Sequence, residues 1–476
     1  MATAKRIAKN SLYIFSGNIF GAVIQLILIV YMVRYLGAEA FGKYSFAASF
    51  SSIFAILLDL GLSVLSIREI SKNTQKAGEY LSNILIIKTV LSFVTLILIF
   101  TAINLMRYPP DTTLAVYIFA GIIVLSSFTS SFKSIFRAFE RMQYEAVISI
   151  TEKILVFVLV MSALLYGYGL IGVILAMLMA QAMISLIAFI TVLKKFTRPF
   201  SKFDAKLSRK LLKEALPFGI ASVFSVIYFQ TDTIMLSMMK GDIVVGWYGA
   251  AYRLVMGTLF VPIAFVAALY PVLSKSFTSS KEEFIKIFKK GFKLLAIFAI
   301  PLGIGTTLLA DKIIELLYGN EFTESIVALQ ILIWVASLMS LYMIVGHVLA
   351  SMNRQKIDTY VTGVSAILNV VLNFMLIPKY GLVGAGIASI FSQIFVLLLE
   401  LRYLKRLGYD PDVLQVITKP LTAGVIMGFW IYAVESVSES IIIISVTALI
   451  IYIFILYLLK TFDGDELEIL KTIIKK

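Results

Sequence analysis

The sequence contains no cysteine and a single histidine, and only 15% of its 476 residues are charged. The lack of cysteine excludes disulfides and thiolate metal or redox sites, and one histidine provides no histidine cluster for a metal. Nucleophile elbows, Walker loops and kinase-type glycine loops are also absent. We therefore expect neither an enzyme nor a bound cofactor.

The scarcity of charge is matched by an excess of apolar residues, which make up 60% of the chain. A soluble chain is nearer half apolar and about a quarter charged, so most of this length is expected to lie in lipid. Fourteen apolar runs are long enough to cross about 30 Å of hydrocarbon. They cover residues 11–33, 44–67, 81–105, 113–132, 147–166, 170–192, 215–239, 246–273, 292–314, 325–350, 358–377, 382–403, 417–435 and 440–460.

The net charge of +14 is spread over short clusters between these runs. This distribution is typical of membrane topology, and we expect no nucleic-acid partner. Most lysines and arginines fall in alternate loops and in both tails, which predicts a multi-pass protein of the cell membrane with both termini in the cytoplasm.

Two segments of the chain resemble segments about 200 residues further on. Gly37, Gly42, Tyr44 and Ala47 reappear after 204 residues as Gly241, Gly246, Tyr248 and Ala251. In the same way, YGLIGVILA (168–176) resembles YGLVGAGIA (380–388) at an offset of 212. Each repeat unit holds an even number of spans, so the two halves are predicted to be parallel repeats about an axis along the membrane normal.

The predicted fold is therefore an all-α polytopic membrane protein with two six-helix lobes and two additional C-terminal helices. The lobes cover residues 1–195 and 215–405, with an amphipathic cytoplasmic linker at 196–214. Residues 406–476 form the last two spans and a surface helix in the tail. In the linker, Phe203, Leu207 and Leu211 recur every four residues among lysines and arginines. This spacing is typical of a helix in the headgroup plane, and a solvated connector is the alternative.

Four segments, at 9–50, 136–146, 215–236 and 369–389, resemble a known family. They are similar to the polysaccharide transporter branch of the multidrug, oligosaccharidyl-lipid and polysaccharide (MOP) exporter superfamily. The resemblance runs over the whole chain through loose patterns of glycine, asparagine, proline and aromatic residues. It implies a flippase that moves isoprenoid-pyrophosphate-linked oligosaccharides to the outer leaflet by alternating access. It also implies two alternatives, a lipid II flippase and a Na⁺- or H⁺-coupled multidrug exporter.

Charged residues inside the predicted spans are costly and each needs a reason. Arg253 and Asp232 lie at similar depths in consecutive spans and are candidates to pair. In a flippase, Arg253 would meet a substrate phosphate, because its planar group donates two hydrogen bonds to an anion. A permanent structural ion pair is the alternative.

Three more cations, Arg34, Lys88 and Lys153, could add to a cationic lining for a lipid-linked pyrophosphate. Lys88 and Lys153 also lie near enough to the cytoplasmic end for their amines to reach water. Asp59 is the candidate for ion coupling to Na⁺ or H⁺, since desolvation favours its protonated form. It would alternatively cap a broken helix before Gly61 or pair with Lys88.

Overall fold

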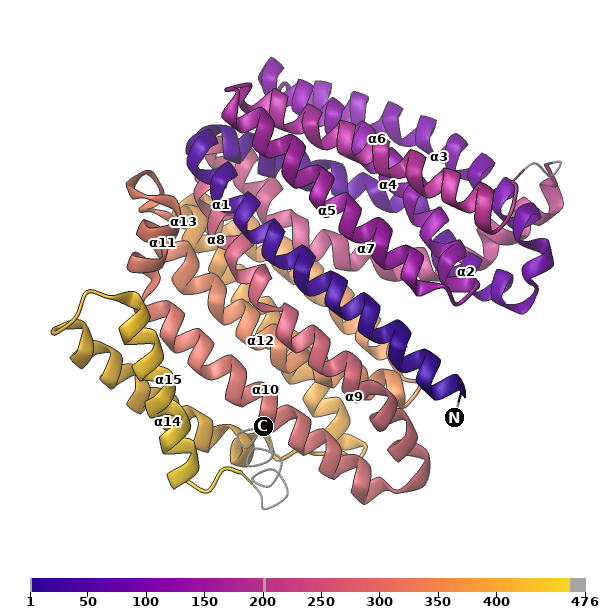
Figure 1. Ribbon diagram of the computed structural model, residues 1–476. Coiled ribbons are helices and arrows are strands. Elements are labelled where there is room, and N and C mark those ends of the chain that lie inside the picture. Colours follow the sequence, from indigo (N-terminus) through magenta and orange to yellow (C-terminus); the bar gives the residue numbers. More distant parts are fainter. Residues whose placement is uncertain (1, 200–202, 463–476) are drawn as a thin grey trace. The chain divides into compact units, whose positions relative to one another are not determined.

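The computed structural model describes residues 2–199 and 203–462, and every regular element within them is a helix (Figure 1). The predicted all-α polytopic fold class is thus confirmed. The chain divides into two compact units, Met1–Gly249 and Ala250–Lys476. The predicted lobes were defined by the sequence repeat, whereas these units are defined by compactness. The lobe boundaries therefore stay a prediction. The predicted tail helix, within 463–476, lies outside the described residues.

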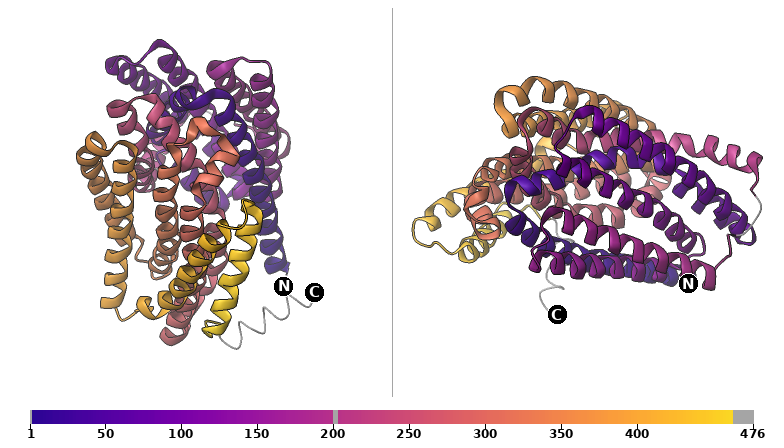
Figure 2. Two further views of the ribbon diagram at one scale, coloured as in Figure 1. Left: turned by 90° about the vertical axis from the view of Figure 1, so that its left-hand side faces the viewer. Right: turned by 90° about the horizontal axis from the view of Figure 1, so that it is seen from above.

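The first unit is a bundle of long helices. Helices α4, α5 and α6 contact one another and α3 lies against α4 (Figures 1 and 2). The helices are α1 (Ala2–Asp59), α2 (Leu62–Lys72), α3 (Ala77–Met106), α4 (Pro110–Ala138), α5 (Met142–Leu165), α6 (Gly169–Lys195), α7 (Ala205–Lys240) and the first half of α8 (Asp242–Thr258).

The second unit continues the all-helical pattern. Helix α12 packs on α10 and α13, and the hairpin of α14 and α15, yellow in Figures 1 and 2, packs beside α10. The helices are α9 (Phe260–Ser279), α10 (Lys281–Leu308), α11 (Ala310–Tyr318), α12 (Ser325–Ser351), α13 (Gln355–Arg406), α14 (Val413–Glu435) and α15 (Ile441–Leu458).

Eleven segments of the described chain are long and apolar enough to cross a membrane. Two of them, Gly21–Lys72 and Gln355–Arg406, are 52 residues long, and each contains a glycine with positive φ. The predicted spans 11–33 and 44–67 lie on either side of Gly37, at φ 72°, and spans 358–377 and 382–403 flank Gly381, at φ 56°. The helix therefore turns where two spans were predicted to meet, and the total of fourteen spans remains a prediction.

The first sequence match corresponds to matching backbone structure. Gly37 has φ 72° and ψ 175°, and Gly241 has φ 85° and ψ 179°. This conformation is essentially restricted to glycine because a Cβ atom would clash. The paired tyrosines, Tyr44 and Tyr248, are both buried. The two glycine turns are thus equivalent in local structure, while the symmetry of whole lobes stays a prediction.

The predicted linker is partly incorporated into α7. Leu211 is only 3% exposed and packs with Leu62 and Ile84, whereas Phe203 is 55% exposed. The apolar face of this segment is therefore covered by α2 and α3 at Leu211, rather than lying wholly against lipid headgroups.

Candidate functional site

The second predicted span is interrupted near one end. Helix α1 ends at Asp59, Leu60 and Gly61 take positive φ, and α2 begins at Leu62. The Ser63 hydroxyl donates a hydrogen bond to Asp59 Oδ1, and the Ser63 amide lies 3.4 Å from Asp59 Oδ2. Asp59 thus caps the first turn of α2, where helical amides have no intrahelical partner.

Asp59 also pairs with Lys88 on α3. The Lys88 side chain is fully buried, and its Nζ lies 2.7 Å from Asp59 Oδ1. Lys88 further donates to the Ser127 carbonyl at 2.9 Å and lies 3.4 Å from Ser63 Oγ. Three protein acceptors match the three protons of an ammonium group. The structure therefore brings two of the predicted site residues together as an ion pair whose lysine is fully buried.

A polar pocket of about 200 Å³ adjoins this ion pair. Ser63 links the ion pair to the pocket. Its hydroxyl donates a hydrogen bond to Asp59 and lies 3.1 Å from the hydroxyl of Ser130 on α4, which also lines the pocket. The pocket lies among α2, α4, α5 and α6. It is lined by Ser63, Val64, Ile67, Ser126, Thr129, Ser130, Lys133, Ser134, Arg137, Glu152 and Gln181.

The charges of this polar pocket are balanced by close pairs. Lys133 Nζ lies 2.9 Å from Glu152 Oε2. Arg137 donates from Nε to Glu145 Oε2 at 2.8 Å and from Nη2 to the other oxygen, a two-pronged contact. Planar, two-pronged pairs of this kind are strong and orientation-specific. Both cations are thus held in place at the pocket, with their positive charge largely compensated.

The other predicted residues are not among those that line this pocket. Arg34 is exposed on α1, and Lys153 Nζ lies 3.3 Å from Gln25 Oε1. Asp232 is buried and accepts a hydrogen bond from the Tyr248 hydroxyl at 2.7 Å. Asp232 belongs to the first unit and Arg253 to the second, and their pairing stays a prediction.

Sequence reasoning missed Lys133, Arg137 and Glu145, and it considered Glu152 only as an acid that would favour an exporter. Lys133, Arg137 and Glu145 lie between the predicted spans 113–132 and 147–166, where charges resemble ordinary loop charges, whereas Glu152 lies inside the second of these spans. The available signal was spacing: Lys133 and Arg137 are four residues apart on one face of a helix, and Glu145 and Glu152 are two turns apart on the next helix.

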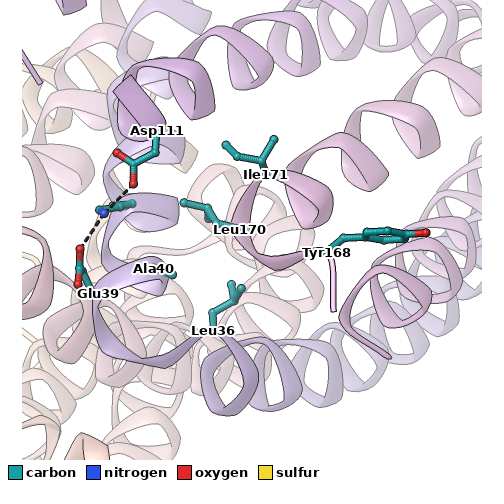
Figure 3. Close-up of a pocket in the computed structure, with 8 residues that line it drawn as sticks. Leu36, Glu39, Ala40, Asp111, Tyr168, Leu170 and Ile171 are labelled. Atoms are coloured by element: carbon teal, nitrogen blue, oxygen red, sulfur yellow. Dashed lines mark hydrogen bonds and ion pairs between the residues drawn. The ribbon is translucent and has the colours of Figure 1, made fainter. Parts of the chain in front are cut away.

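A second pocket opens at the other end of the same bundle (Figure 3). There, Lys43 Nζ lies 2.7 Å from both Glu39 Oε1 and Asp111 Oδ2, and dashed lines in Figure 3 mark both contacts. Leu170 and Ile171 supply apolar walls. The lysine ties the turn after Gly37 to the start of α4, which is a structural role.

The helical bundle and its internal polar pocket define a polytopic membrane protein of the transporter class. The chain belongs to the polysaccharide biosynthesis protein family, whose model matches residues 7–277, and the MatE family model matches residues 217–375. It is 27% identical to the "Probable low-salt glycan biosynthesis flippase Agl15" of Haloferax volcanii, covering 89% of this chain and 90% of that protein. It is 21% identical to the "Capsular polysaccharide biosynthesis protein CapF" of Staphylococcus aureus, over 84% and 99% of the two chains.

Solved structures show the same fold. The lipid II flippase MurJ, in an inward closed conformation, matches with a TM-score of 0.77 at 17% identity, covering 93% of this chain and 97% of MurJ. An inward-facing multidrug resistance transporter of the MATE family and MOP superfamily matches with a TM-score of 0.69 at 19% identity, covering 82% and 95%. The family resemblance predicted from the sequence is confirmed.

Proposed function

We propose that this chain is a flippase that carries the headgroup of an isoprenoid-pyrophosphate-linked oligosaccharide from the cytoplasmic to the outer leaflet by alternating access. The transported glycan would serve the synthesis of surface polysaccharide or another surface glycan. Family membership and the names of the Haloferax and Staphylococcus relatives support this assignment. We infer transport rather than catalysis, driven without a nucleotide.

The polar pocket of the first unit is the observation that carries this proposal. Its lining hydroxyls both donate and accept hydrogen bonds, as the hydroxyls of a sugar require. Lys133 and Arg137 stand beside those hydroxyls and suit a phosphate. Because Arg137 already engages Glu145, a substrate phosphate would compete with that carboxylate for the same guanidinium.

The cations predicted from the sequence differ in whether they are proposed to contact the substrate directly. Arg34, Lys153 and Arg253 do not line the polar pocket, so they stay proposed contacts of the pyrophosphate from the sequence alone, with Asp232 as the proposed partner of Arg253. Lys88 would act only through its charge, since its ammonium is already bonded to protein. Coupling of Na⁺ or H⁺ through Asp59 would require Lys88 to release that carboxylate.

The main alternative is a cation-coupled multidrug exporter, which needs acidic groups open to a cationic drug. Two candidate acids are already neutralised, Asp59 by Lys88 at 2.7 Å and Glu152 by Lys133 at 2.9 Å. An incoming cation would have to displace a lysine from each. This pairing favours an anionic headgroup over a cationic drug.

The proposed orientation places both termini in the cytoplasm. A cluster of lysines in the N-terminal half of α10, near the start of α14 and just after the end of α15 supports it, because positive charge gathers on the cytoplasmic side of membrane proteins. The cluster lines one pocket and consists of Lys286, Lys289, Lys290, Lys293, Lys419 and Lys460.

Flipping of a fluorescent isoprenoid-pyrophosphate oligosaccharide in proteoliposomes tests the proposal. Lys133→Ala removes a charged hydrogen-bond donor worth about 1.5–3 kcal/mol, so flipping should slow by about tenfold or more. Lys72→Ala is the matched control, because this lysine is 62% exposed in a surface pair with Glu69. It should flip at the wild-type rate.

Two results would contradict the assignment. Equal flipping rates for the Lys133→Ala and Lys72→Ala variants would show that the transported headgroup does not bind in the polar pocket. Wild-type protein that moves no lipid-linked sugar but exchanges a cationic dye under a Na⁺ or proton gradient would establish the exporter instead.

A further inference from the structure

The second unit contains a buried acidic side chain that the proposed function does not use. Glu400 on α13 has no exposed surface, and neither of its carboxylate oxygens has a hydrogen-bond partner among the described residues. Its neighbours one turn away on the same helix, Leu397 and Leu404, belong to the main apolar core of this unit. Such a group in its ionised form would be very costly there.

A second carboxyl group lies beside it. Asp358 lies within electrostatic range of Glu400, and both carboxyl groups lie near the Tyr342 hydroxyl. Tyr342, on α12, donates a hydrogen bond to Asp358 Oδ1 at 2.6 Å and lies 3.4 Å from Thr362 Oγ1. Asp358 therefore has a donor and partial solvent access, while Glu400 has neither.

The sharp turn of α13 explains why the two acids meet. Gly381, at φ 56°, folds the 52-residue helix into two arms. Asp358 lies near the start of the first arm and Glu400 near the end of the second, so the fold returns the two carboxyl groups to the same end of the helical hairpin. Helix α12 packs against this hairpin and brings Tyr342.

No cation among the described residues compensates the two acids, since neither forms an ion pair there. Two titratable groups near the ends of these helices, His347 and Arg354, have partners of their own. His347 Nδ1 lies 2.8 Å from the Met343 carbonyl and its ring packs edge-on against Tyr270 of α9. Arg354 Nη1 lies 3.2 Å from the Tyr403 hydroxyl. Lys286, Lys289, Lys290 and Lys293 of α10 line the lysine-rich pocket described above. A carboxylate buried without a hydrogen-bond donor or a cation is costly to ionise, and Glu400 is such a group.

We propose that Asp358 and Glu400 form a proton-binding site in which Glu400 carries the proton while α12 rests on the α13 hairpin. When α12 moves away and water enters, the Glu400 O–H bond breaks and the proton passes to water, leaving a carboxylate. This exchange would let a proton gradient drive transport, a conclusion that rests on the proposed flippase function. Proton binding at Glu400 does not depend on that function.

Infrared difference spectroscopy on the purified full-length protein tests proton binding directly. A protonated carboxylic acid has its own carbonyl stretching band, which shifts in heavy water. We expect this band in wild-type protein at neutral pH, its loss in Glu400→Gln, and a displaced band in Asp358→Asn. Gln has nearly the shape of protonated Glu, so the Glu400 variant should fold.

Glu145→Gln is the matched control, because Glu145 is also a buried acid but accepts hydrogen bonds from Arg137 at both of its oxygens. This control should leave the band unchanged. A neutral-pH spectrum with no such band, or a band that survives Glu400→Gln, overturns the proposal.

A second experiment tests coupling to transport: a pH gradient is imposed on proteoliposomes that contain the protein and the fluorescent oligosaccharide lipid. Wild-type flipping that responds to the gradient and Glu400→Gln flipping that does not would support coupling. Gradient-independent wild-type flipping overturns coupling. A complete absence of flipping, with the infrared band intact, refutes the flippase assignment and leaves the proton site standing.

Discussion

Two glycines that correspond in the sequence repeat hold α1 and α8 at unusually close distance. A methyl group added at Gly42 would lie 1.8 Å from the Asp242 carbonyl oxygen, and one at Gly246 would lie 1.9 Å from the Ala38 carbonyl oxygen. Asp242 is itself the repeat equivalent of Ala38, so the contact is reciprocal. We therefore predict that Gly42→Ala and Gly246→Ala are both strongly destabilising.

The size of the effect follows from what must move. Ordinary van der Waals contact begins near 3.4 Å, so the helices would have to separate by about 1.6 Å locally. Overpacking costs about 1–3 kcal/mol when side chains can yield. Here the obstacle is backbone, so we expect about 3 kcal/mol or more, which is a fall in Tm of roughly 5–10 °C.

Thermal unfolding of the purified protein in detergent measures the effect. Gly257→Ala is the matched control, because Gly257 is an exposed position in α8 and an added methyl group meets nothing within 4 Å. It should be neutral or stabilising by up to about 1 kcal/mol. The double variant Gly42→Ala/Gly246→Ala should lose less than the sum, because one displacement relieves both clashes. A Tm for Gly42→Ala equal to that of the control would refute the close approach.

Two further predictions concern ion pairs and are checked by the same unfolding assay. Asp59→Asn leaves Lys88 buried without its carboxylate and should cost about 3 kcal/mol, whereas adding Lys88→Met should recover much of that loss; equal losses would contradict the pairing. Asp410, 2.8 Å from Lys405, has its pKa lowered below the usual value by that hydrogen bond. A lowered pKa stabilises the fold above the ordinary value of about 4 and ceases to do so as pH falls through the folded value. Asp410→Asn should thus cost about 0.5 kcal/mol at pH 7 after solvent screening, and this difference should vanish in acid.

The spans were predictable because lipid demands long apolar runs, and the helix turns at Gly37 and Gly381 fall between the expected spans. Hydropathy did not predict the helix break at Leu60 and Gly61, because an apolar run does not indicate where its backbone departs from a helix. The break before Gly61 was only an alternative reading of Asp59. For Asp59, capping a break before Gly61 and pairing with Lys88 were the alternatives to ion coupling, and the structure contains both contacts; its ion-coupling role stays a prediction.

The polar pocket was harder to predict than the fold. Lys133 and Arg137 follow an apolar run directly, and sequence alone does not tell whether such a charge meets water or a neighbouring helix. Their partners, Glu145 and Glu152, lie on the next helix, so the pairs depend on how α4 and α5 pack. Glu400 was missed for a related reason: it lies near the end of a predicted span, and its burial depends on α12 and both arms of α13.

The charged groups inside the helical units fall into two kinds with different consequences. Asp59, Glu145 and Glu152 each meet a lysine or arginine, so their charge is compensated in place and no change of protonation is needed. Glu400 meets another acid in an apolar core, so it can avoid the cost of ionisation only by keeping a proton. Because that cost falls once water reaches the group, a movement that opens the core around Glu400 changes its proton affinity, and by linkage the proton resists that movement. Under the proposal above, energetic coupling between proton and conformation therefore belongs to Glu400, the acid without a cation, and not to the paired acids.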